Sequence, residues 1–209
     1  MPHFSQMNKK DLMAKIHGYI ASDGGIYNMR VKDIHGKKLR IRRKLRTKFF
    51  NQDKELIDDF INIIHMLYPK IKSIRYYPKR YEVEVRNNTI SKDILKLGKV
   101  WSSNWEFPKS LNDKQKKLWI AAFTDCDGTV QNRNYDRFVA IDSINKNGLR
   151  RISRVLEDFG ITNKIYNING GSFRLKIFRR ENLIKFNSLI KLNHLGKRRK
   201  LIEAINSYK

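Results

Sequence analysis

Cysteine is almost absent from this sequence, since Cys126 is the only one, so no disulfide can form within the chain. A single cysteine is typical of proteins that work in a reducing compartment. The sequence also lacks any apolar run near the roughly 18 residues that a membrane span needs. Residues 1–10 show neither a signal-peptide core nor a transit-peptide pattern. We therefore expect an intracellular protein without a membrane segment. The five histidines have no ligand-like spacing with Cys126, which argues against a structural zinc site.

Acidic residues are also scarce compared with basic ones. The chain has 20 Asp and Glu against 45 Lys and Arg, a net charge of +25, while 40% of its residues are hydrophobic. The hydrophobic content excludes a disordered tail. The charge indicates a strongly anionic partner, and a nucleic acid backbone is the obvious candidate. Charge alone does not distinguish an enzyme from a structural RNA-binding protein.

The hydrophobic pattern of the chain repeats after about a hundred residues, which indicates duplication of one unit. In the first half it predicts a helix over 11–22, strands over 26–32 and 39–50 with a turn at His35-Gly36, a helix over 53–68, strands over 71–77 and 81–86, and a helix over 91–97. In the second half it predicts a helix from 112 to 128, strands over 130–132 and 137–143, a helix over 149–159, strands over 163–168 and 173–178, and helices over 181–192 and 197–208.

Both halves therefore read α-β-β-α-β-β-α, which predicts an α+β fold of two pseudo-symmetric halves. We expect the first half to cover residues 1–98 and the second to cover 112–209. Residues 99–111 have no regular period and are interpreted as an ordered linker. Its Trp101 and Trp105 are expected to pack against the halves.

Each half begins with a helix that ends in a similar segment. Residues 16–24 read Ile-His-Gly-Tyr-Ile-Ala-Ser-Asp-Gly, and residues 120–128 read Ile-Ala-Ala-Phe-Thr-Asp-Cys-Asp-Gly. Small side chains lie four residues apart in both segments, Gly18 with Ser22 and Ala122 with Cys126. Residues at this spacing share one helix face, and small ones let two helix backbones approach closely. If the two helices pack together, their C-terminal ends meet.

Asp23 and Asp127 lie at those helix ends. A helix C-terminus carries partial negative charge, and two close carboxylates repel each other, so the arrangement is unfavourable without a cation. Mg²⁺ binds one or two carboxylates together with water and phosphate oxygens. A single Asp-Gly pair after a helix would be an ordinary stop signal. Two copies in the same context indicate a site for metal-assisted phosphodiester hydrolysis.

These two segments resemble the paired motifs of single-chain LAGLIDADG homing endonucleases, and the resemblance extends over nearly the whole chain through the repeated element order. It implies two packed motif helices joining two antiparallel, saddle-shaped sheets that bind the DNA major groove. It assigns the catalytic metal to Asp23 and Asp127, with the backbone carbonyls of Ser22 and Cys126 joining the coordination. It implies Mg²⁺ as the metal, with Mn²⁺ able to substitute and Ca²⁺ binding without supporting cleavage.

The sequence departs from the family pattern at a few motif positions. The sixth position holds Ala21 in the first motif and Asp125 in the second, and this position varies in the family. The third position of the second motif is Ala122 where glycine is usual, and alanine is still small enough for close packing. Neither departure argues against activity, because both acids of the eighth position are present.

Other candidate catalytic residues lie outside the motifs. Leu-Gly-Lys occurs after the third helix of each half, and the resemblance assigns its lysines, Lys99 and Lys197, to the solvent network around the scissile phosphates. The alternative is a helix-ending glycine followed by a solvated lysine. Polar residues between a strand and a helix could position the attacking water or could cap the helix. They are Asn51 and Gln52 in the first half, and Ser143 and Asn145 in the second.

The strand over 39–50 alternates between apolar and basic residues. One face carries Arg40, Arg42, Lys44, Arg46 and Lys48, and these five cations would repel one another without an anionic partner. This pattern favours a DNA-binding sheet face. The residues that we expect to contact DNA are Asn28, Arg30, Lys32, Arg40, Arg42, Lys44, Arg75, Tyr77, Glu82, Glu84, Arg86, Gln131, Arg133, Arg137, Arg174, Lys176, Lys197 and Arg198.

The resemblance implies a site-specific double-strand endonuclease that recognises a long asymmetric site, leaves short 3′ overhangs and serves intron homing. A single chain that supplies both acids is expected to act as a monomer on double-stranded DNA. The gene would belong to an archaeal cytoplasm or to an organelle. The alternative is an intron RNA maturase on the same scaffold, and a third possibility is a DNA-binding regulator without nuclease activity.

Overall fold

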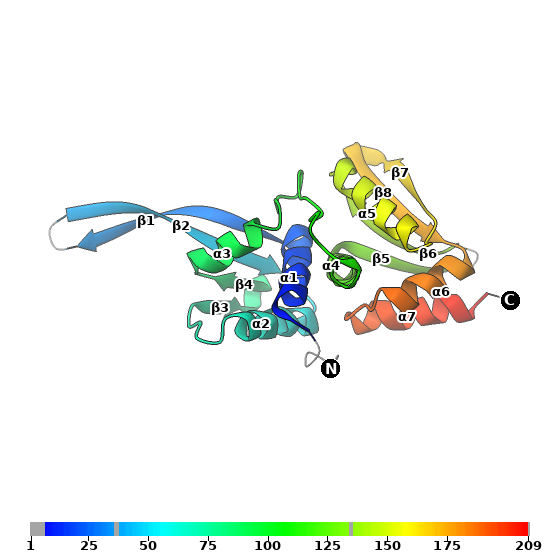
Figure 1. The fold of residues 1–209 in the computed structure, drawn as a ribbon, viewed down its shortest axis with the longest axis horizontal. Helices are drawn as coiled ribbons and strands as arrows, with labels where there is room; N and C mark the ends of the chain where they lie inside the picture. The colour runs from blue at the N-terminus through cyan, green and yellow to red at the C-terminus, as the bar shows by residue number, and fades with distance from the viewer. Residues whose placement is uncertain (1–6, 36–37, 134–135, 209) are drawn as a thin grey trace.

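The structure, a computed structural model, describes residues 7–35, 38–133 and 136–208. The first half contains α1 (Lys9–Asp23), β1 (Gly24–His35), β2 (Lys38–Phe50), α2 (Lys54–Leu67), β3 (Ile74–Tyr77), β4 (Glu82–Val85) and α3 (Asn88–Leu95). The second half contains α4 (Asp113–Asp127), β5 (Gly128–Arg133), β6 (Asp136–Ser143), α5 (Lys146–Asp158), β7 (Asn163–Ile168), β8 (Ser172–Phe178), α6 (Arg180–Leu189) and α7 (Leu195–Asn206). This order confirms the predicted α+β repeat, and Figure 1 shows the two halves on either side of α1 and α4.

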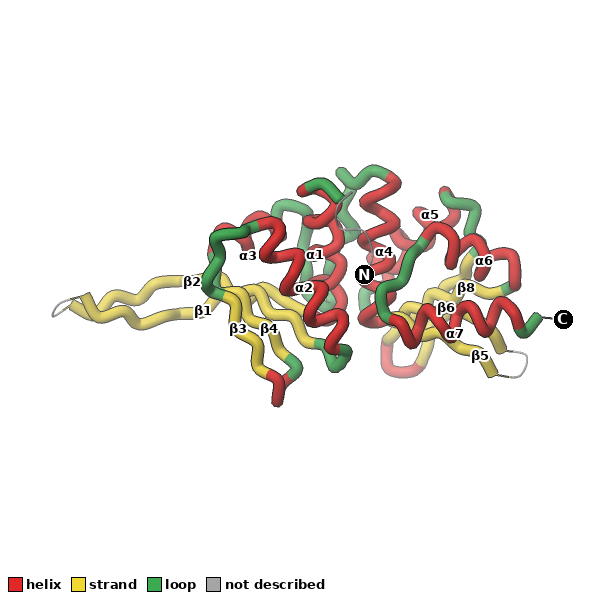
Figure 2. Tube along the Cα trace, turned by 90° about the horizontal axis from the view of Figure 1, so that it is seen from below, coloured by secondary structure: helices red, strands yellow, loops and turns green. Residues whose placement is uncertain are grey.

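The two sheets have the same topology. Each has four antiparallel strands, in the order β1-β2-β4-β3 in the first half and β5-β6-β8-β7 in the second. Helices cover one side of each sheet, as Figure 2 shows, and leave the other side without a helical layer. The predicted strand turn at His35-Gly36 falls partly on Gly36, which lies outside the described residues.

The motif helices α1 and α4 pack directly against each other. A Cβ placed on Gly18 would lie 2.7 Å from the backbone oxygen of Trp119 and 3.1 Å from the Cβ of Ala122. No real side chain tolerates the shorter of these distances, so glycine is what allows this approach. The small residues of the two motifs therefore occupy the helix crossing, as their spacing predicted.

The N-terminal ends of α1 and α4 are also tied together. Asn8 caps α1 in a capping box with Asp11, and Asn112 caps α4 in the same way with Gln115. The Asp11 carboxylate also accepts hydrogen bonds from α4, from the Lys114 ammonium at 2.6 Å and from the Gln115 amide at 3.3 Å. Because the helices start side by side and cross closely, their last residues meet.

The linker packs into the same core through Trp105. This side chain is 3% exposed and its ring centroid lies 5.7 Å from that of Trp119 and 4.7 Å from that of Phe123. Trp101 is 43% exposed and forms an edge-to-face contact with Tyr27 on β1, at 6.2 Å between ring centroids. The packing predicted for the linker tryptophans therefore holds for Trp105, whereas Trp101 stays on the surface.

A buried histidine joins the linker to both motif helices. Trp119 Nε1 donates to His17 Nδ1 at 2.9 Å, so His17 Nε2 carries the proton and donates to the Gly98 carbonyl at 3.2 Å. Burial lowers the pKa of His17 to about 4, and the imidazole is therefore neutral at physiological pH.

None of the helices in the described part of the chain combines the length and apolar character that a membrane span requires.

Candidate metal centre and nucleic-acid interface

Asp23 is the last residue of α1 and Asp127 is the last residue of α4. Their carboxyl groups lie close enough to affect each other's pKa, so the structure brings together the two predicted metal ligands. Burial raises the pKa of both groups, and the neighbouring Asp23 charge adds to the effect on Asp127, whose pKa reaches about 7. Two adjacent acids of this kind hold a proton between them or require a cation.

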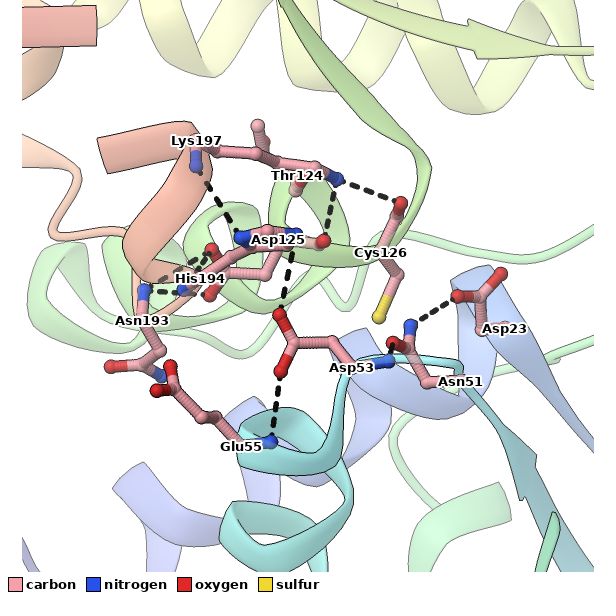
Figure 3. A network of polar contacts seen from close by, with 10 residues as sticks. All are labelled: Asp23, Asn51, Asp53, Glu55, Thr124, Asp125, Cys126, Asn193, His194 and Lys197. Carbon is pink, nitrogen blue, oxygen red and sulfur yellow. Dashed lines mark hydrogen bonds and ion pairs between the residues drawn. The ribbon is translucent and has the colours of Figure 1, made fainter. Parts of the chain in front are cut away.

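On the first-half side, Asn51 fixes the position of Asp23. Its side-chain nitrogen donates to Asp23 Oδ2 at 2.7 Å, and its side-chain oxygen accepts from the Asp53 backbone N–H at 2.8 Å (Figure 3). The second bond orients the amide so that its NH₂ group faces the acid. Gln52 lines the cleft next to Asp23, so both first-half candidates lie near the acid.

On the second-half side, the corresponding residues face the linker instead. Phe49 pairs with the residue after Asp23, and Ile141 pairs with the residue after Asp127, so Ser143 corresponds to Asn51. Ser143 Oγ accepts from Trp105 Nε1 at 3.2 Å. Asn145 caps α5 and donates to the Trp105 carbonyl at 2.7 Å. The structure thus gives Ser143 and Asn145 linker-holding and capping contacts, and no described contact joins them to Asp127.

Lys197 lies at the C-terminal end of α4. Its Nζ donates to three consecutive carbonyl oxygens, those of Thr124 at 3.2 Å, Asp125 at 2.6 Å and Cys126 at 2.9 Å (Figure 3). A cation in this position compensates the negative helix end, where the Thr124 carbonyl also accepts from the Gly128 backbone N–H. Burial lowers the pKa of Lys197. The helix-ending glycine predicted before it is wrong, since Gly196 lies in the first turn of α7.

Lys99 has a different environment from Lys197. Its side chain is 60% exposed, and its Nζ lies 3.5 Å from Glu106 Oε1 within the linker. It borders a cleft formed by linker residues and the start of α5. Among the described contacts, none brings Lys99 to either motif acid, so the structure does not group Lys99 with the site.

The residues before the two acids are also constrained. Ser22 Oγ shares its proton between the carbonyl oxygens of Gly18 and Tyr19, both at 3.0 Å, so the hydroxyl is held against its own helix. The Cys126 carbonyl already accepts from Lys197. Burial raises the pKa of the Cys126 thiol well above its usual range, so this sulfur stays protonated and is a poor ligand.

The donor set fits a hard divalent cation that completes its coordination with substrate and water. The described residues contain no group of three or more His, Cys, Asp or Glu side chains that could hold a metal alone. Two carboxylates and nearby backbone carbonyls are the oxygen donors that Mg²⁺ or Ca²⁺ prefers. The chain by itself would therefore hold such an ion only partly, and phosphate oxygens would supply further ligands.

Asp125, at the variable sixth motif position, has a structural role that the sequence analysis missed. Its carboxylate is 1% exposed and accepts from the backbone N–H groups of Asn193, at 2.9 and 3.1 Å, and His194, at 3.1 Å. His194 Nε2 in turn lies 3.3 Å from Asp53 Oδ2 of the first half (Figure 3). Burial raises the pKa of Asp125 to about 7. The only signal in the sequence was an acid on the buried face of a motif helix.

Strand register corrects the predicted face of β1. Ile26 is buried in the core, and alternation places Asn28, Arg30 and Lys32 on the same face as Ile26. The opposite face of the hairpin carries Arg42 and Lys44 of β2, whose register partners are Val31 and Met29, together with Tyr27. The prediction was off by one residue, and in a strand such a shift moves every side chain to the other face. The side chain of Arg40 lies outside the described residues.

Two of the five cations that the sequence places on one face of β2 are paired with acids of the same sheet. Lys48 forms an ion pair with Glu82 at 2.6 Å, and Arg46 forms one with Glu84 at 2.8 Å. Arg86 also pairs with Glu84, at 2.6 Å. The two glutamates are only 4% and 2% exposed, so they are covered by the cations in the free protein. They neutralise the centre of this sheet face.

Arg75 and Tyr77 share the face of these glutamates, because their register partners are Glu84 and Glu82. In the second sheet, Arg133 and Gln131 lie on the face opposite the buried Val130. The contact of these residues with DNA stays a prediction. Arg198 is exposed on α7.

Three basic residues of the second sheet are tied to acids or to the helix layer. Arg174 makes two hydrogen bonds to Asp142, at 2.8 and 2.7 Å, and Lys176 pairs with Asp136 at 2.8 Å. Arg137 donates to Ser207 Oγ at 2.5 Å and stacks on Tyr208. Arg137 therefore points to the helical side of the sheet, away from the side on which the other predicted DNA contacts of this sheet lie.

Comparison with known proteins agrees with this architecture. Residues 114–191 match the family model described as a LAGLIDADG-like domain. No curated protein matches the chain. The structure of the homing endonuclease I-DmoI in complex with DNA and Mn is 23% identical, with a TM-score of 0.65 over 90% of this chain and 100% of that chain.

Two further solved structures extend the comparison. I-DmoI in complex with DNA and Ca has a TM-score of 0.69 at 20% identity, over 90% of this chain and 93% of that chain. The N-terminal LAGLIDADG domain of DUF199/WhiA has a TM-score of 0.61 at 12% identity, over 95% of this chain and 90% of that chain. The chain is therefore a protein of the two-motif LAGLIDADG fold, and its second half matches the LAGLIDADG-like family model itself.

Proposed function

We propose that the chain is a DNA endonuclease that hydrolyses phosphodiester bonds with divalent metal bound at Asp23 and Asp127. The observation that carries this proposal is the meeting of two half-buried, interacting carboxyl groups at the ends of two packed helices. The structures of I-DmoI with DNA and with Mn or Ca support it, because they contain DNA and divalent metal on the same fold.

The chain's own residues prepare this site in three ways. Asp23, Asp127 and the Ser22 carbonyl would hold the metal, which supplies charge stabilisation and an activated water when bound. Asn51 holds Asp23 in one orientation through its hydrogen bond. Lys197 secures the backbone that leads to Asp127 and adds a positive charge beside the two acids. Such fixed groups lower the cost of reorganisation during reaction.

The two sheets are the proposed DNA-binding surfaces. They flank the acid pair, and β-ribbons fit the major groove of DNA. Because their exposed residues differ, we propose recognition of an asymmetric double-stranded site, with the net charge of +25 favouring backbone contacts. Double-strand cleavage with short 3′ overhangs, Mg²⁺ as the preferred metal and a monomeric enzyme are parts of the same proposal.

Single substitutions at the acids test the proposal. A plasmid library with a randomised insert is incubated with Mg²⁺ and the wild-type protein, and the broken ends are sequenced to recover the target. Asp23→Asn and Asp127→Asn should each abolish cleavage of that target and leave binding largely intact. Asp113→Asn, which removes an acid that is 69% exposed on the first turn of α4, is the matched control. Cleavage by both motif variants at the wild-type rate would refute the assignment.

RNA maturation stays a prediction of the sequence. An intron-splicing assay with and without the protein tests it independently of the cleavage assay.

A further inference from the structure

The cleft beside Asp23 contains a cation that the motifs do not include. This cleft has a volume of about 410 Å³ and is lined by Asp23, Phe50, Asn51, Gln52, Arg80 and Tyr81. Asp23 ends α1, and residues 50–52 lie at the end of β2 and directly after it. Arg80 and Tyr81 come from the turn between β3 and β4. A turn that is distant in sequence thus reaches the candidate active site.

The turn is held against the site by its backbone. Pro78 begins a single 3-10 turn, and Tyr81 follows it in the left-handed conformation, with φ 51° and ψ 35°. The Tyr81 carbonyl accepts from the Asn51 backbone N–H at 2.9 Å, and the Asn51 side chain donates to Asp23. Non-glycine residues adopt this conformation rarely, and it is often found where surrounding contacts fix a functional loop. Arg80 is therefore anchored to the residue that orients the acid.

Arg80 differs from the other basic residues around it. Arg46 and Arg86 are paired with Glu84 on the same sheet face. Arg80 is exposed, and within the described part of the chain its guanidinium has a ring contact with Tyr77, at 5.9 Å, but no carboxylate partner. Its five donors are thus available to an anion that enters the cleft.

In the second half, the described residues of the corresponding turn include no basic residue. The corresponding turn between β7 and β8 consists of Asn169, Gly170 and Gly171. Two cations of that side are already engaged: Lys197 donates to three carbonyl oxygens, and Arg174 is paired with Asp142, an acid that influences Asp127. Among these described residues, the unpaired guanidinium therefore lies on the Asp23 side.

We propose that Arg80 binds a phosphate of the DNA strand that enters the Asp23 cleft, and that it supports cleavage of this strand more than of the other. This inference rests on the proposed endonuclease function. A guanidinium matches two phosphate oxygens in a bidentate geometry, which positions the phosphate and offsets its repulsion by the carboxylates. The two strands would then depend on different residues.

A nicking assay tests the inference with Arg80→Gln and the matched control Lys79→Gln. Lys79 is an exposed cation of the same turn that does not line the Asp23 cleft. The substrate is a supercoiled plasmid carrying the selected target, with each strand followed by end-labelling. Arg80→Gln should slow the cleavage of one strand by about 100-fold, which is the effect of losing one preorganised donor. Nicked circles should therefore accumulate. Lys79→Gln should cut both strands at nearly the wild-type rate.

Binding and folding measurements complete the test. In EDTA, the affinity of Arg80→Gln for the target should fall by less than about tenfold. The salt dependence of its binding should correspond to one phosphate contact fewer. Thermal unfolding should match the wild type, because Arg80 has no ion pair to lose. Equal slowing of both strands, or no greater effect than Lys79→Gln, would overturn the inference. Failure of the wild-type protein to cut any duplex would instead remove the proposed function.

Discussion

The two halves of the molecule share one topology and differ in the chemistry around their acids. Asn51 in the first half hydrogen-bonds to Asp23, whereas its counterpart Ser143 binds the linker Trp105. The end of α4 is secured by Lys197, whereas Lys99, the lysine at the corresponding place in the first half, pairs with Glu106 in the linker. The hydrophobic pattern that the halves share therefore sets their architecture, whereas individual polar residues give the two acids different neighbours.

The halves also differ in the reach of their sheets. The β1 and β2 strands have 12 and 13 residues, whereas β5 and β6 have 6 and 8. The longer pair projects as a hairpin beyond the rest of its sheet, as Figure 1 shows at the left. Two-stranded ribbons fit the major groove. Under the proposed function, the DNA contacted by the first half would therefore extend further from the cleavage site.

The largest expected effect comes from the helix crossing that the halves share. Gly18→Leu places side-chain atoms where a Cβ already approaches the Trp119 carbonyl oxygen to 2.7 Å. The backbones must separate, so we expect a loss of about 3 kcal/mol or more in the free energy of unfolding. Urea denaturation measures it. Gly196→Ala is the control, since its new Cβ meets only the His194 ring at 3.2 Å. Unchanged stability of Gly18→Leu would contradict the close crossing.

The next effect concerns a buried group that only the first motif has, since His17 corresponds to Ala121 in the second. The folded-state pKa of about 4 lies below the unfolded value near 6.5. The unfolded chain therefore takes up a proton first as the pH falls, and this contribution to stability is lost from pH 6.5 down to 4. The full loss is about 3 kcal/mol.

Chemical denaturation between pH 7 and 4 measures this loss by difference from His17→Gln. The difference is needed because the raised pKa values of Asp125 and Asp127 act in the opposite direction. Wild-type stability should fall more steeply with acid than that of the variant. Parallel curves would show that His17 stays accessible to protons.

A smaller effect separates the two lysines that sequence symmetry treats as equivalent. Lys197→Met removes three hydrogen bonds to carbonyl oxygens at the end of α4. We expect a loss of about 2 kcal/mol in the free energy of unfolding, as for a charged hydrogen-bonded group. Lys99→Met should change stability little, because its ammonium is exposed. Equal losses in the two variants would contradict the asymmetry.

The fold was predictable because its signals are local and repeated. Helical spacing and glycine stops identified α1 and α4, and their aspartates followed from the same segments. The face of β1 was mistaken because apolar residues occur at both parities of this strand, at Ile26 and at Val31. Alternation alone could not show which of the two is buried.

The other errors have a different physical origin. Lys197 meets α4, and Arg80 reaches Asp23, only after chain segments far apart in sequence pack together. The pairing of Glu82 with Lys48 likewise depends on strand register across a sheet. Contacts of this kind leave no periodic pattern in the sequence from which they could be predicted.

The central claim is that Asp23 and Asp127 share a divalent cation. Fe²⁺ bound in place of the native metal, with ascorbate and peroxide, generates hydroxyl radicals that cut the polypeptide near the ion. In the complex with the selected duplex, we expect backbone cuts close to both residues 23 and 127. Both sets of cuts should be lost in Asp127→Asn. Cuts confined to other segments, or cuts near residue 23 that persist in Asp127→Asn, would contradict it.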